Sequence, residues 1–383
     1  MAKSPVKIFI SLMLLTAFGG ALWFAMSDHS SKIKAADVAA TTAANAIVLE
    51  GLIALDVETY LKDPRVTKIL ADKNITVNAT RIGSREMANR VKSGMTVDFF
   101  FPSGIVAANQ ISDAAKKVNI NTVSYSPFYT PMVMASWVPI AKILTANKIA
   151  KPLGPSSEST KIYGLDLQQL TDLMLAKKRW KDLPGSSAYD VSRSILVSTT
   201  DVRKSNSAAM YLALSSFAIN KGELVTDKAT ARQVALKVSE LFKRQGYQEN
   251  YVNGNFDDYV SIGMGKTPLA FIYENQMVSY AISKKGIGAD MVLMYPTPTI
   301  FNKVVFVAGN DKAKILGELL ANDPQLQKIG IEYGFRGSDA AAFAAEAKKA
   351  GLTVNERIVE VVDPPAYEVM AEMIEVITQE MKQ

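Results

Sequence analysis

The chain has no cysteine and a single histidine, His29, among its 383 residues. Thiol nucleophiles, Ser-His-Asp triads and Cys/His zinc sites all need those residues, so the sequence excludes all three. We therefore predict that the protein is not an enzyme and has neither a cofactor nor a metal ion. The lack of cysteine is also typical of an oxidising compartment, where a stray thiol is a liability.

The chain also lacks a strong excess of charge. Its 43 Lys and Arg residues stand against 37 Asp and Glu residues, a formal net charge of +6. The basic residues are scattered, so we expect no binding to nucleic acid. Apolar residues make up 48% of the sequence, which allows a large core. At about 100–200 residues per domain, the length predicts two domains or lobes.

A long apolar run without charge, Ile8–Met26, follows Lys3 and Lys7 near the N-terminus. Spanning a bilayer takes about 17–25 apolar residues, whereas the core of a signal peptide has about 7–15. We therefore predict that residues 1–26 are an uncleaved membrane anchor, with the rest of the chain outside the membrane.

A cleaved signal peptide is the alternative for this region, with cleavage near Ala35-Ala36 or Ala39-Ala40. In either case residues 27–45, rich in Ala, Ser, Thr and Lys without periodicity, are predicted to form a tether. A second segment of this kind, residues 151–160, is rich in Pro, Gly and Ser and is expected to be a surface loop.

From residue 46 onward, short β-like runs alternate with helical ones, which predicts an α/β fold with largely parallel sheets. The expected strands are 46–50, 75–80, 97–101, 132–137, 195–200, 269–273, 291–295 and 303–307. The expected helices are 56–61, 64–71, 85–92, 140–147, 167–177, 208–220, 229–244, 275–283, 313–321, 324–333, 340–350 and 367–382.

The stretch 198–207, Ser-Thr-Thr-Asp-Val-Arg-Lys-Ser-Asn-Ser, lies between an expected strand and an expected helix. The first turn of a helix has unpaired N–H groups, and its dipole favours negative charge, so such a start can hold an anion. The other reading is an ordinary N-cap, which favours Ser and Asn. A capping box would place Glu or Gln three residues after Ser205, but Ala208 stands there, and this favours a ligand.

Small polar residues follow several other expected strands. Ser84, Ser103 and Thr297 each lie just after one. Ligands of parallel α/β sheets bind at the carboxyl ends of the strands, so the recurrence of such residues indicates a binding site there. Each residue taken alone is more often a helix cap.

The order of motifs along the chain resembles a type II periplasmic or extracellular solute-binding protein, the Venus-flytrap partner of ABC importers. The resemblance spans about residues 46–335 and is closest to the branch that binds molybdate, sulfate and phosphate. It rests on Tyr60-Leu61-Lys62-Asp63-Pro64, Gly83 to Met87, Asp98 to Ser103, Thr199 to Ser207, Tyr273-Glu274-Asn275, Tyr295-Pro296-Thr297, and Gln327 to Phe335.

The resemblance implies a protein of the bacterial periplasm or a similar extracytoplasmic space, tethered to the inner membrane by residues 8–26. Its two lobes would close on a small, anionic ligand and present it to an ABC permease. The first lobe would comprise residues 46–128 and 298–383, and the second residues 129–297. The chain would cross between them near residues 126–132 and 295–302, and these crossings would form a hinge. We expect the extracytoplasmic part to be a monomer.

The ligand contacts that the resemblance and the strand ends together predict come from both lobes. They are Ser84, Ser103, Thr200, Ser205, Asn206, Ser207, Tyr273, Glu274 and Thr297. Glu274 would repel an anion unless Arg203 neutralises it or the ligand carries a proton.

Two departures from the family pattern motivate an alternative function. Ala54-Leu55 stands where relatives present a hydroxyl residue, and Ala208 where many have glycine. The alternative is an interaction module that keeps the flytrap fold but docks on a membrane complex of the envelope without transporting solute.

Gly265-Lys266-Thr267 is not a P-loop, since Val260 replaces the first glycine of that motif. Asp257-Asp258 is read as a solvated turn.

Overall fold

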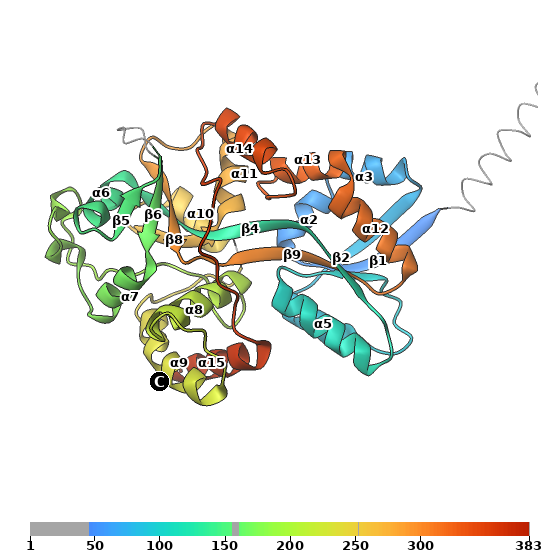
Figure 1. Ribbon diagram of the computed structural model, residues 1–383, viewed down its shortest axis with the longest axis horizontal. Coiled ribbons are helices and arrows are strands. Elements are labelled where there is room, and N and C mark those ends of the chain that lie inside the picture. Colours follow the sequence, from blue (N-terminus) through green and yellow to red (C-terminus); the bar gives the residue numbers. More distant parts are fainter. Residues whose placement is uncertain (1–45, 155–160, 252, 383) are drawn as a thin grey trace, which may run out of the picture. The chain divides into compact units, whose positions relative to one another are not determined.

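The computed structural model describes residues 46–154, 161–251 and 253–382 (Figure 1). The predicted anchor and tether lie outside these ranges. Within them, no helix combines the length and the apolar character that crossing a membrane requires. The larger of two compact units, Leu49–Ile69 with Val77–Gln383, contains the residues of the candidate sites described below.

Side by side in the sheets, the described strands have the order β2-β1-β3-β9-β4-β8-β6-β5, and β7 pairs in addition with β4. Their bounds are β1 Ile47–Ile53, β2 Ile75–Arg81, β3 Phe99–Phe101, β4 Val123–Trp137, β5 Ala150–Pro152, β6 Ile162–Asp166, β7 Leu269–Tyr273, β8 Met291–Thr297 and β9 Phe301–Ala308. We call the part formed by β1, β2, β3, β9 and the start of β4 the first sheet. The end of β4 with β5 to β8 forms the second sheet.

The long strand β4 belongs to both sheets. It pairs antiparallel with β9 as far as Pro131, and from Met132 onward with β7 and β8. Figure 1 shows β4 and β9 running side by side. The chain passes between the sheets a second time where β8 leads into β9, after a cis bond between Thr297 and Pro298.

The predicted "largely parallel" character of the sheets is wrong in part. The β1–β3 and β6–β8 pairs are parallel, but β9 runs antiparallel to both β3 and β4, and β7 and β8 run antiparallel to β4. The reason is that β4 and β9 connect the sheets rather than starting a strand–helix–strand unit, and an antiparallel pair needs no crossover helix.

The helices cover the sheets and connect their strands. Their bounds are α2 Leu55–Leu61, α3 Pro64–Ala71, α4 Ser84–Met87, α5 Ile105–Lys117, α6 Val138–Ala146, α7 Leu167–Leu175, α8 Asn206–Ile219, α9 Lys228–Lys243, α10 Gly254–Ser261, α11 Glu274–Lys284, α12 Asp311–Asn322, α13 Pro324–Glu332, α14 Ala340–Lys349 and α15 Tyr367–Glu380.

Several of these helices begin where a short polar side chain caps them. Asp227 accepts a bond from the amide of Thr230 at the start of α9, and Asn310 and Asp323 act in the same way for α12 and α13. Such caps satisfy N–H groups that the helix itself cannot pair. Because capping residues mark a helix start in the sequence, the predicted starts of α9, α12 and α13 lie within two residues of the observed ones.

Helix α8 is buried on nearly all sides, including Leu212, Leu214 and the two serines Ser215 and Ser216. A helix that is apolar all round belongs inside a core. Its packing against α7, α9 and β7 fixes the position of its N-terminus, where the Ser-Asn-Ser sequence lies.

The expected strand 195–200 is not a strand in the structure. A single parallel bridge joins Ser198 to Ala270, because neighbouring backbone groups find side-chain partners instead. The amide of Thr199 donates to Gln245 Oε1 at 2.9 Å, and Asn255 Nδ2 donates to the carbonyls of both Ser198 and Phe271 at 2.9 Å. A ladder cannot extend where its donors and acceptors are already used.

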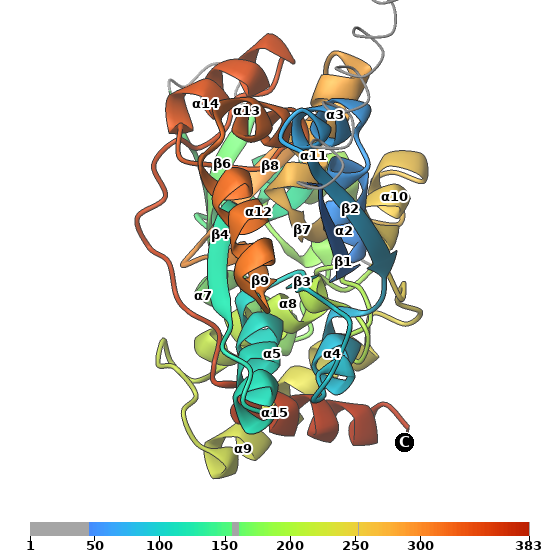
Figure 2. The same cartoon turned by 90° about the vertical axis from the view of Figure 1, so that its right-hand side faces the viewer.

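The C-terminal helix does not join the first lobe as the predicted boundary, 298–383, requires. Helix α15 packs on α9, with Arg232 bonded to Glu372 at 2.6 Å and Lys243 to Glu380 at 3.0 Å. Helix α14 packs on α11 and α13, and Figure 2 shows α13 and α14 next to each other. Apolar residues of α14 and α15 belong to the core of the second sheet, whereas the predicted boundary places both helices in the first lobe.

Candidate ligand-binding site

A chain of buried hydroxyl groups lies at the N-terminus of α8. Ser205 Oγ and Thr200 Oγ1 lie 3.0 Å and 2.8 Å from Ser207 Oγ, and none of these residues is more than 5% exposed. Ser205 occupies the N-cap position with extended backbone, yet its side chain accepts no bond from the first helical turn. No side chain therefore caps the amides at this helix start.

The loop that leads to these hydroxyls is held by Asp201. The carbonyl of Asp201 accepts bonds from the amides of Lys204 and Ser205, while its carboxylate binds the guanidinium of Arg203 through two nitrogens. Burial on its own would raise the pKa of Asp201, but the hydrogen bonds from Arg203 outweigh it and lower the pKa. Arg203 thus supports the loop through Asp201, and the cation that binds Glu274 is Arg336.

A second polar cluster comes from the first sheet. Ser84 Oγ donates to Ser103 Oγ at 3.1 Å, and Ser103 Oγ donates to the carboxylate of Asp56 at 2.8 Å. The amide of Ser103 in turn donates to Ser84 Oγ at 3.0 Å. Asp56 lies in the first turn of α2, next to Ala54-Leu55, where the family pattern has a hydroxyl residue. Its carboxylate accepts the hydrogen bond of the Ser103 hydroxyl, one of the predicted ligand contacts.

Burial raises the pKa of Asp56, and the hydrogen bond from Ser103 opposes this rise only in part. A carboxyl group that is removed from water favours its neutral form, because the charged form loses its hydration. Protonated Asp56 can donate a hydrogen bond, whereas ionised Asp56 only accepts. The protonation state of Asp56 therefore decides whether its carboxyl group can donate or only accept within the cluster.

Asn206 links the two sheets at the centre of the site. Its Nδ2 donates to Tyr273 Oη at 3.0 Å and to Asn302 Oδ1 at 3.2 Å. Gly104 lies against the same groups: a Cβ atom there would be 2.8 Å from Asn302 Oδ1 and 3.3 Å from Asn206 Nδ2. This close approach explains the glycine. Besides burial, the charge of Asp56 raises the pKa of Tyr273, so the Asp56 cluster and Tyr273 interact electrostatically.

The structure thus brings together seven of the nine predicted residues around Asn206. They form two hydroxyl clusters, which we call the Ser84–Ser103 cluster and the Ser205–Ser207 cluster, with Asn206 and Tyr273 beside them. The second cluster includes Thr200.

Glu274, another predicted ligand contact, is bound to partners outside the two hydroxyl clusters. Its carboxylate is 0% exposed and binds Arg336 through Nε at 2.6 Å and Nη2 at 2.8 Å. Tyr295 Oη also donates to it at 2.5 Å. A buried carboxylate needs such partners because its desolvation is costly. The partner, Arg336, is 62 residues away, and no local pattern pointed to it.

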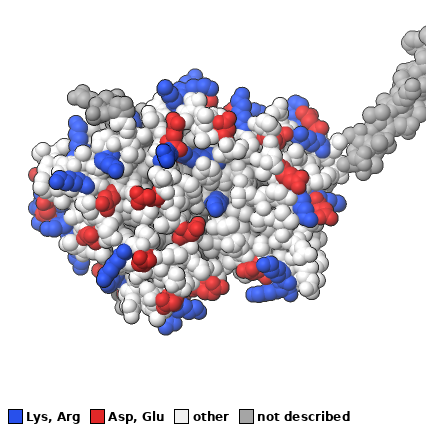
Figure 3. Space-filling model, viewed as in Figure 1, with Lys and Arg blue, Asp and Glu red and all other residues white. Residues whose placement is uncertain are grey.

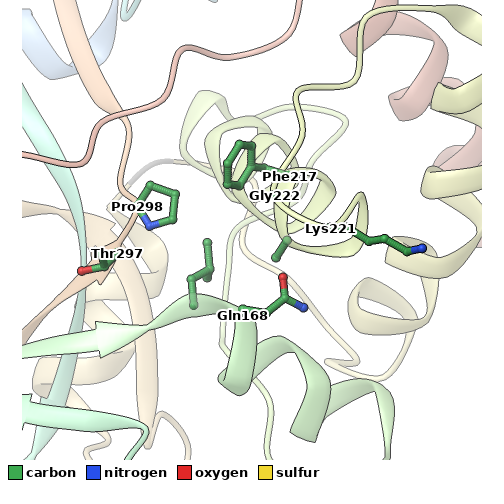
Figure 4. A pocket seen from close by; sticks show the side chains of 8 residues that line it. Gln168, Phe217, Lys221, Gly222, Thr297 and Pro298 are labelled. Carbon is green, nitrogen blue, oxygen red and sulfur yellow. The ribbon is translucent and has the colours of Figure 1, made fainter.

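Thr297 is exposed and lines a different cavity of about 370 Å³. Figure 4 shows Thr297 and Pro298 on one side of this cavity, and Phe217 and Gly222 on another. None of the residues that line this cavity belongs to either hydroxyl cluster. Thr297 is therefore not placed with the other predicted contacts.

Sequence reasoning missed three residues of the site: Asp56, Gly104 and Asn302. For Asp56 there was a signal, because it begins the helix after the first strand, where a donor was expected. Gly104 directly follows Ser103, and its role was visible only once Asn206 and Asn302 were placed. Asn302 was expected to lie just outside a strand, and only the antiparallel pairing of β9 with β4 brings it to the site.

Metal ligands do not gather anywhere in the described part of the chain. Within residues 46–154, 161–251 and 253–382, no group of three or more His, Asp or Glu side chains is arranged to hold a metal ion.

No known protein family and no curated protein matches the sequence. Solved structures, by contrast, match the fold of the chain. The iron-bound HitA of Pseudomonas aeruginosa is 12% identical, with a TM-score of 0.52 over 88% of this chain and 99% of that protein. The chain has the fold of the type II solute-binding proteins. The Trichodesmium protein IdiA (FutA), in complex with iron and citrate, is also 12% identical, with a TM-score of 0.50 over 87% of this chain and 98% of its own.

The same solute-binding fold is found in the periplasmic binding protein P5PA, at 9% identity and a TM-score of 0.50 over 88% of this chain. The sequence motifs had predicted this fold, and the mixed α/β architecture confirms it. At such low identity the likeness concerns the fold alone. The ligand must therefore be argued from this chain's own side chains.

Proposed function

We propose that the protein is an extracytoplasmic solute-binding protein, tethered to the inner membrane by residues 8–26, that delivers a small ligand to an ABC importer. The observation that carries the proposal is the convergence on Asn206 of polar groups from both sheets. Tyr273, Asn302 and Gly104 come from three different segments of the chain, yet all lie against this one amide. The chain binds its ligand and does not transform it.

The donors at the site suit a ligand rich in oxygen. Hydroxyls of Ser103, Thr200 and Ser207, together with the uncapped amides of α8, are uncharged donors. A helix N-terminus and several hydrogen bonds can replace the hydration shell of an anion. On the face shown in Figure 3, basic and acidic side chains are interspersed, so we assign the recognition of charge to the site rather than to the surface.

Asp56 adds a condition to the binding of an anion. An ionised carboxylate beside Ser103 repels a second negative charge, whereas the protonated form donates to it. We therefore propose that the ligand is an oxyanion that binds with one proton, held either by Asp56 or by the ligand itself. Binding would then strengthen as the pH falls.

A thermal-shift screen of the full chain tests the proposal. A ligand present at a thousandfold its Kd adds about 4 kcal/mol to the free energy of unfolding. We expect a rise in melting temperature with one of molybdate, sulfate, phosphate or ferric citrate, and its loss in Ser205→Ala plus Ser207→Ala. The control, Ser215→Ala plus Ser216→Ala, changes two serines of the same helix that lie far from its start. If no oxyanion, amino acid or polyamine shifts the wild-type melting temperature, the proposal fails.

One observation favours the second candidate, an interaction module that docks on a membrane complex. The polar groups of the site already bond to one another: Asp56 to Ser103, and Asn206 to Tyr273 and Asn302. A partner that co-purifies with the chain from membranes without any solute, and equally well with Ser205→Ala plus Ser207→Ala, would support this function. A transport defect in that variant would contradict it.

A further inference from the structure

A second cavity, of about 310 Å³, lies in the part of the molecule built on the second sheet. Its wall combines basic and amide side chains with apolar ones: Arg193, Arg244, Gln245 and Lys266, together with Leu196 and Pro268. None of the nine predicted ligand contacts lines it. Neither the Ser-Asn-Ser start of α8 nor the proposed transport function accounts for this cavity.

Two hydrogen-bond donors in the wall are buried and have no partner among the described residues. Arg244 uses Nη1 to bind the carbonyl of Met174 at 2.7 Å, but its Nη2 is unpaired. Gln245 accepts two bonds from Thr199 at Oε1, while its Nε2 is unpaired. Buried donors without partners cost free energy, so such a pair calls for an acceptor.

The charges around the cavity also favour an anion. Arg193 donates to the backbone carbonyl of Gly265 at 2.8 Å. A carbonyl has no net charge, so this bond does not neutralise the guanidinium. The nearby carboxylates have cations of their own: Asp258 binds Lys266 at 2.5 Å, and Glu240 binds Lys243 at 2.9 Å. The wall therefore presents two guanidinium groups and one amide, all of which donate.

We propose that this cavity binds a small organic anion. Its phosphate or carboxylate group accepts hydrogen bonds from the guanidinium of Arg244 and the side-chain amide of Gln245. A short apolar body of the ligand lies against Leu196 and Pro268. The volume suits a molecule of the size of a substituted benzene rather than a nucleotide, since clefts of about 300 Å³ are at the small end of ligand sites.

Gln245 connects this cavity with the Ser205–Ser207 cluster. The same side chain, with its unpaired Nε2, holds Thr199 through both the backbone amide and the hydroxyl. Thr199 directly precedes Thr200, which bonds to Ser207. An anion that orders Gln245 therefore also orders the segment that leads to the hydroxyls, although the two sites share no ligand contact.

Calorimetric titration of the full chain with phenyl phosphate tests the proposal, with inorganic phosphate as the comparison. We expect phenyl phosphate to bind more tightly than phosphate, because only the former has a group for the apolar wall. Gln245→Glu keeps the acceptor for Thr199 but replaces the free donor by a negative charge, and should weaken binding about tenfold or more. Gln233→Glu, at an exposed position of helix α9, which ends shortly before Gln245, adds the same charge and should change nothing.

Three results would overturn the proposal: no binding of phenyl phosphate to the wild type, undiminished binding to Gln245→Glu, or loss of binding in Ser205→Ala plus Ser207→Ala. The last would place the ligand at the hydroxyl clusters instead. Melting curves identify a variant that fails to fold. If Gln245→Glu does so, Arg244→Gln provides the second test, with the same loss expected because it removes the guanidinium.

Discussion

The charge of Asp56 governs both the stability of the chain and its proposed affinity for anions. Burial raises its pKa above 3.8, so the folded chain keeps this proton at pH values where the unfolded chain has lost it. The folded state then binds more protons than the unfolded state, and stability falls as the pH rises through the raised pKa. Below pH 3.8 Asp56 is mostly protonated in both the folded and the unfolded chain, so it no longer lowers the free energy of unfolding.

The first prediction concerns Asp56→Asn. We expect this variant to be more stable than the wild type at pH 7, and the difference to vanish as the pH falls towards 4, because an amide does not titrate. Urea unfolding at a series of pH values measures this. Asp113→Asn, a change on the exposed face of α5, serves as the control. A wild-type protein that grows more stable relative to Asp56→Asn with rising pH would contradict the assignment.

The second prediction concerns the buried pair of Glu274 and Arg336. Arg336→Met leaves the carboxylate of Glu274 buried without its cation, which should lower the free energy of unfolding by about 3–5 kcal/mol. The double change Glu274→Leu plus Arg336→Met removes both charges and should cost much less. Denaturant unfolding gives both values.

The matched control for this pair is Arg179→Ala, which removes a partner of Asp182. These side chains are 48% and 28% exposed. Exposed pairs contribute about 0–1 kcal/mol, so the control should be nearly neutral. Equal losses from Arg179→Ala and Arg336→Met would show that the buried pair does not stabilise the fold as described.

At the scale of elements, the contact of α15 with α9 is the feature that the sequence did not predict. Met373 of α15 is 0% exposed and lies in the core of the second sheet. The third prediction is that Met373→Ala lowers the free energy of unfolding by about 2–5 kcal/mol, through lost burial and the cavity left behind. Gln379→Ala, at an exposed position of the same helix, should stay within about 0.5 kcal/mol. A loss confined to the second variant would argue against this packing.

Elements with a strong period and a clear cap were predictable from the sequence. Helices α3, α9 and α13 fall within a residue of their expected bounds, because apolar spacing and capping residues both mark them. Helix α5 was missed since its buried face is mostly alanine, at Ala108 and Ala115, which gives a weak apolar stripe. Helix α10 was missed because it is short and begins with Gly254-Asn255, both poor helix formers.

The hydroxyl residues of the candidate site could be predicted from the sequence, but the part that Asp56 plays there could not. The Ser-Asn-Ser start of α8 and the Ser84–Ser103 cluster follow from residue type and position along the sheet. The partners of Glu274 and Asn206 could not be predicted, because Arg336 and Asn302 are 62 and 96 residues away in sequence. Contacts of this kind depend on how β4, β9 and α11 are packed, which no local pattern specifies.

At the scale of the whole molecule, the proposed anchor at residues 8–26 sets an expectation about where the protein acts. The fourth prediction is that the protein isolated from bacterial membranes retains residues 1–26. Its intact mass should then equal the 41.6 kDa of the full chain. A mature N-terminus near Ala36 or Ala40, found by mass spectrometry in a soluble extract, would show instead that Ile8–Met26 is a cleaved signal peptide.

The link between β8 and β9 is held by a distant segment of the chain. This segment leads from α14 to α15 and passes Thr299: the amide of Thr299 donates to the carbonyl of Glu360, and the amide of Val362 donates to the carbonyl of Thr299. The two hydrogen bonds make the segment a brace on the link. Any change in the direction of the link therefore has to break these bonds or carry residues 360–362 with it.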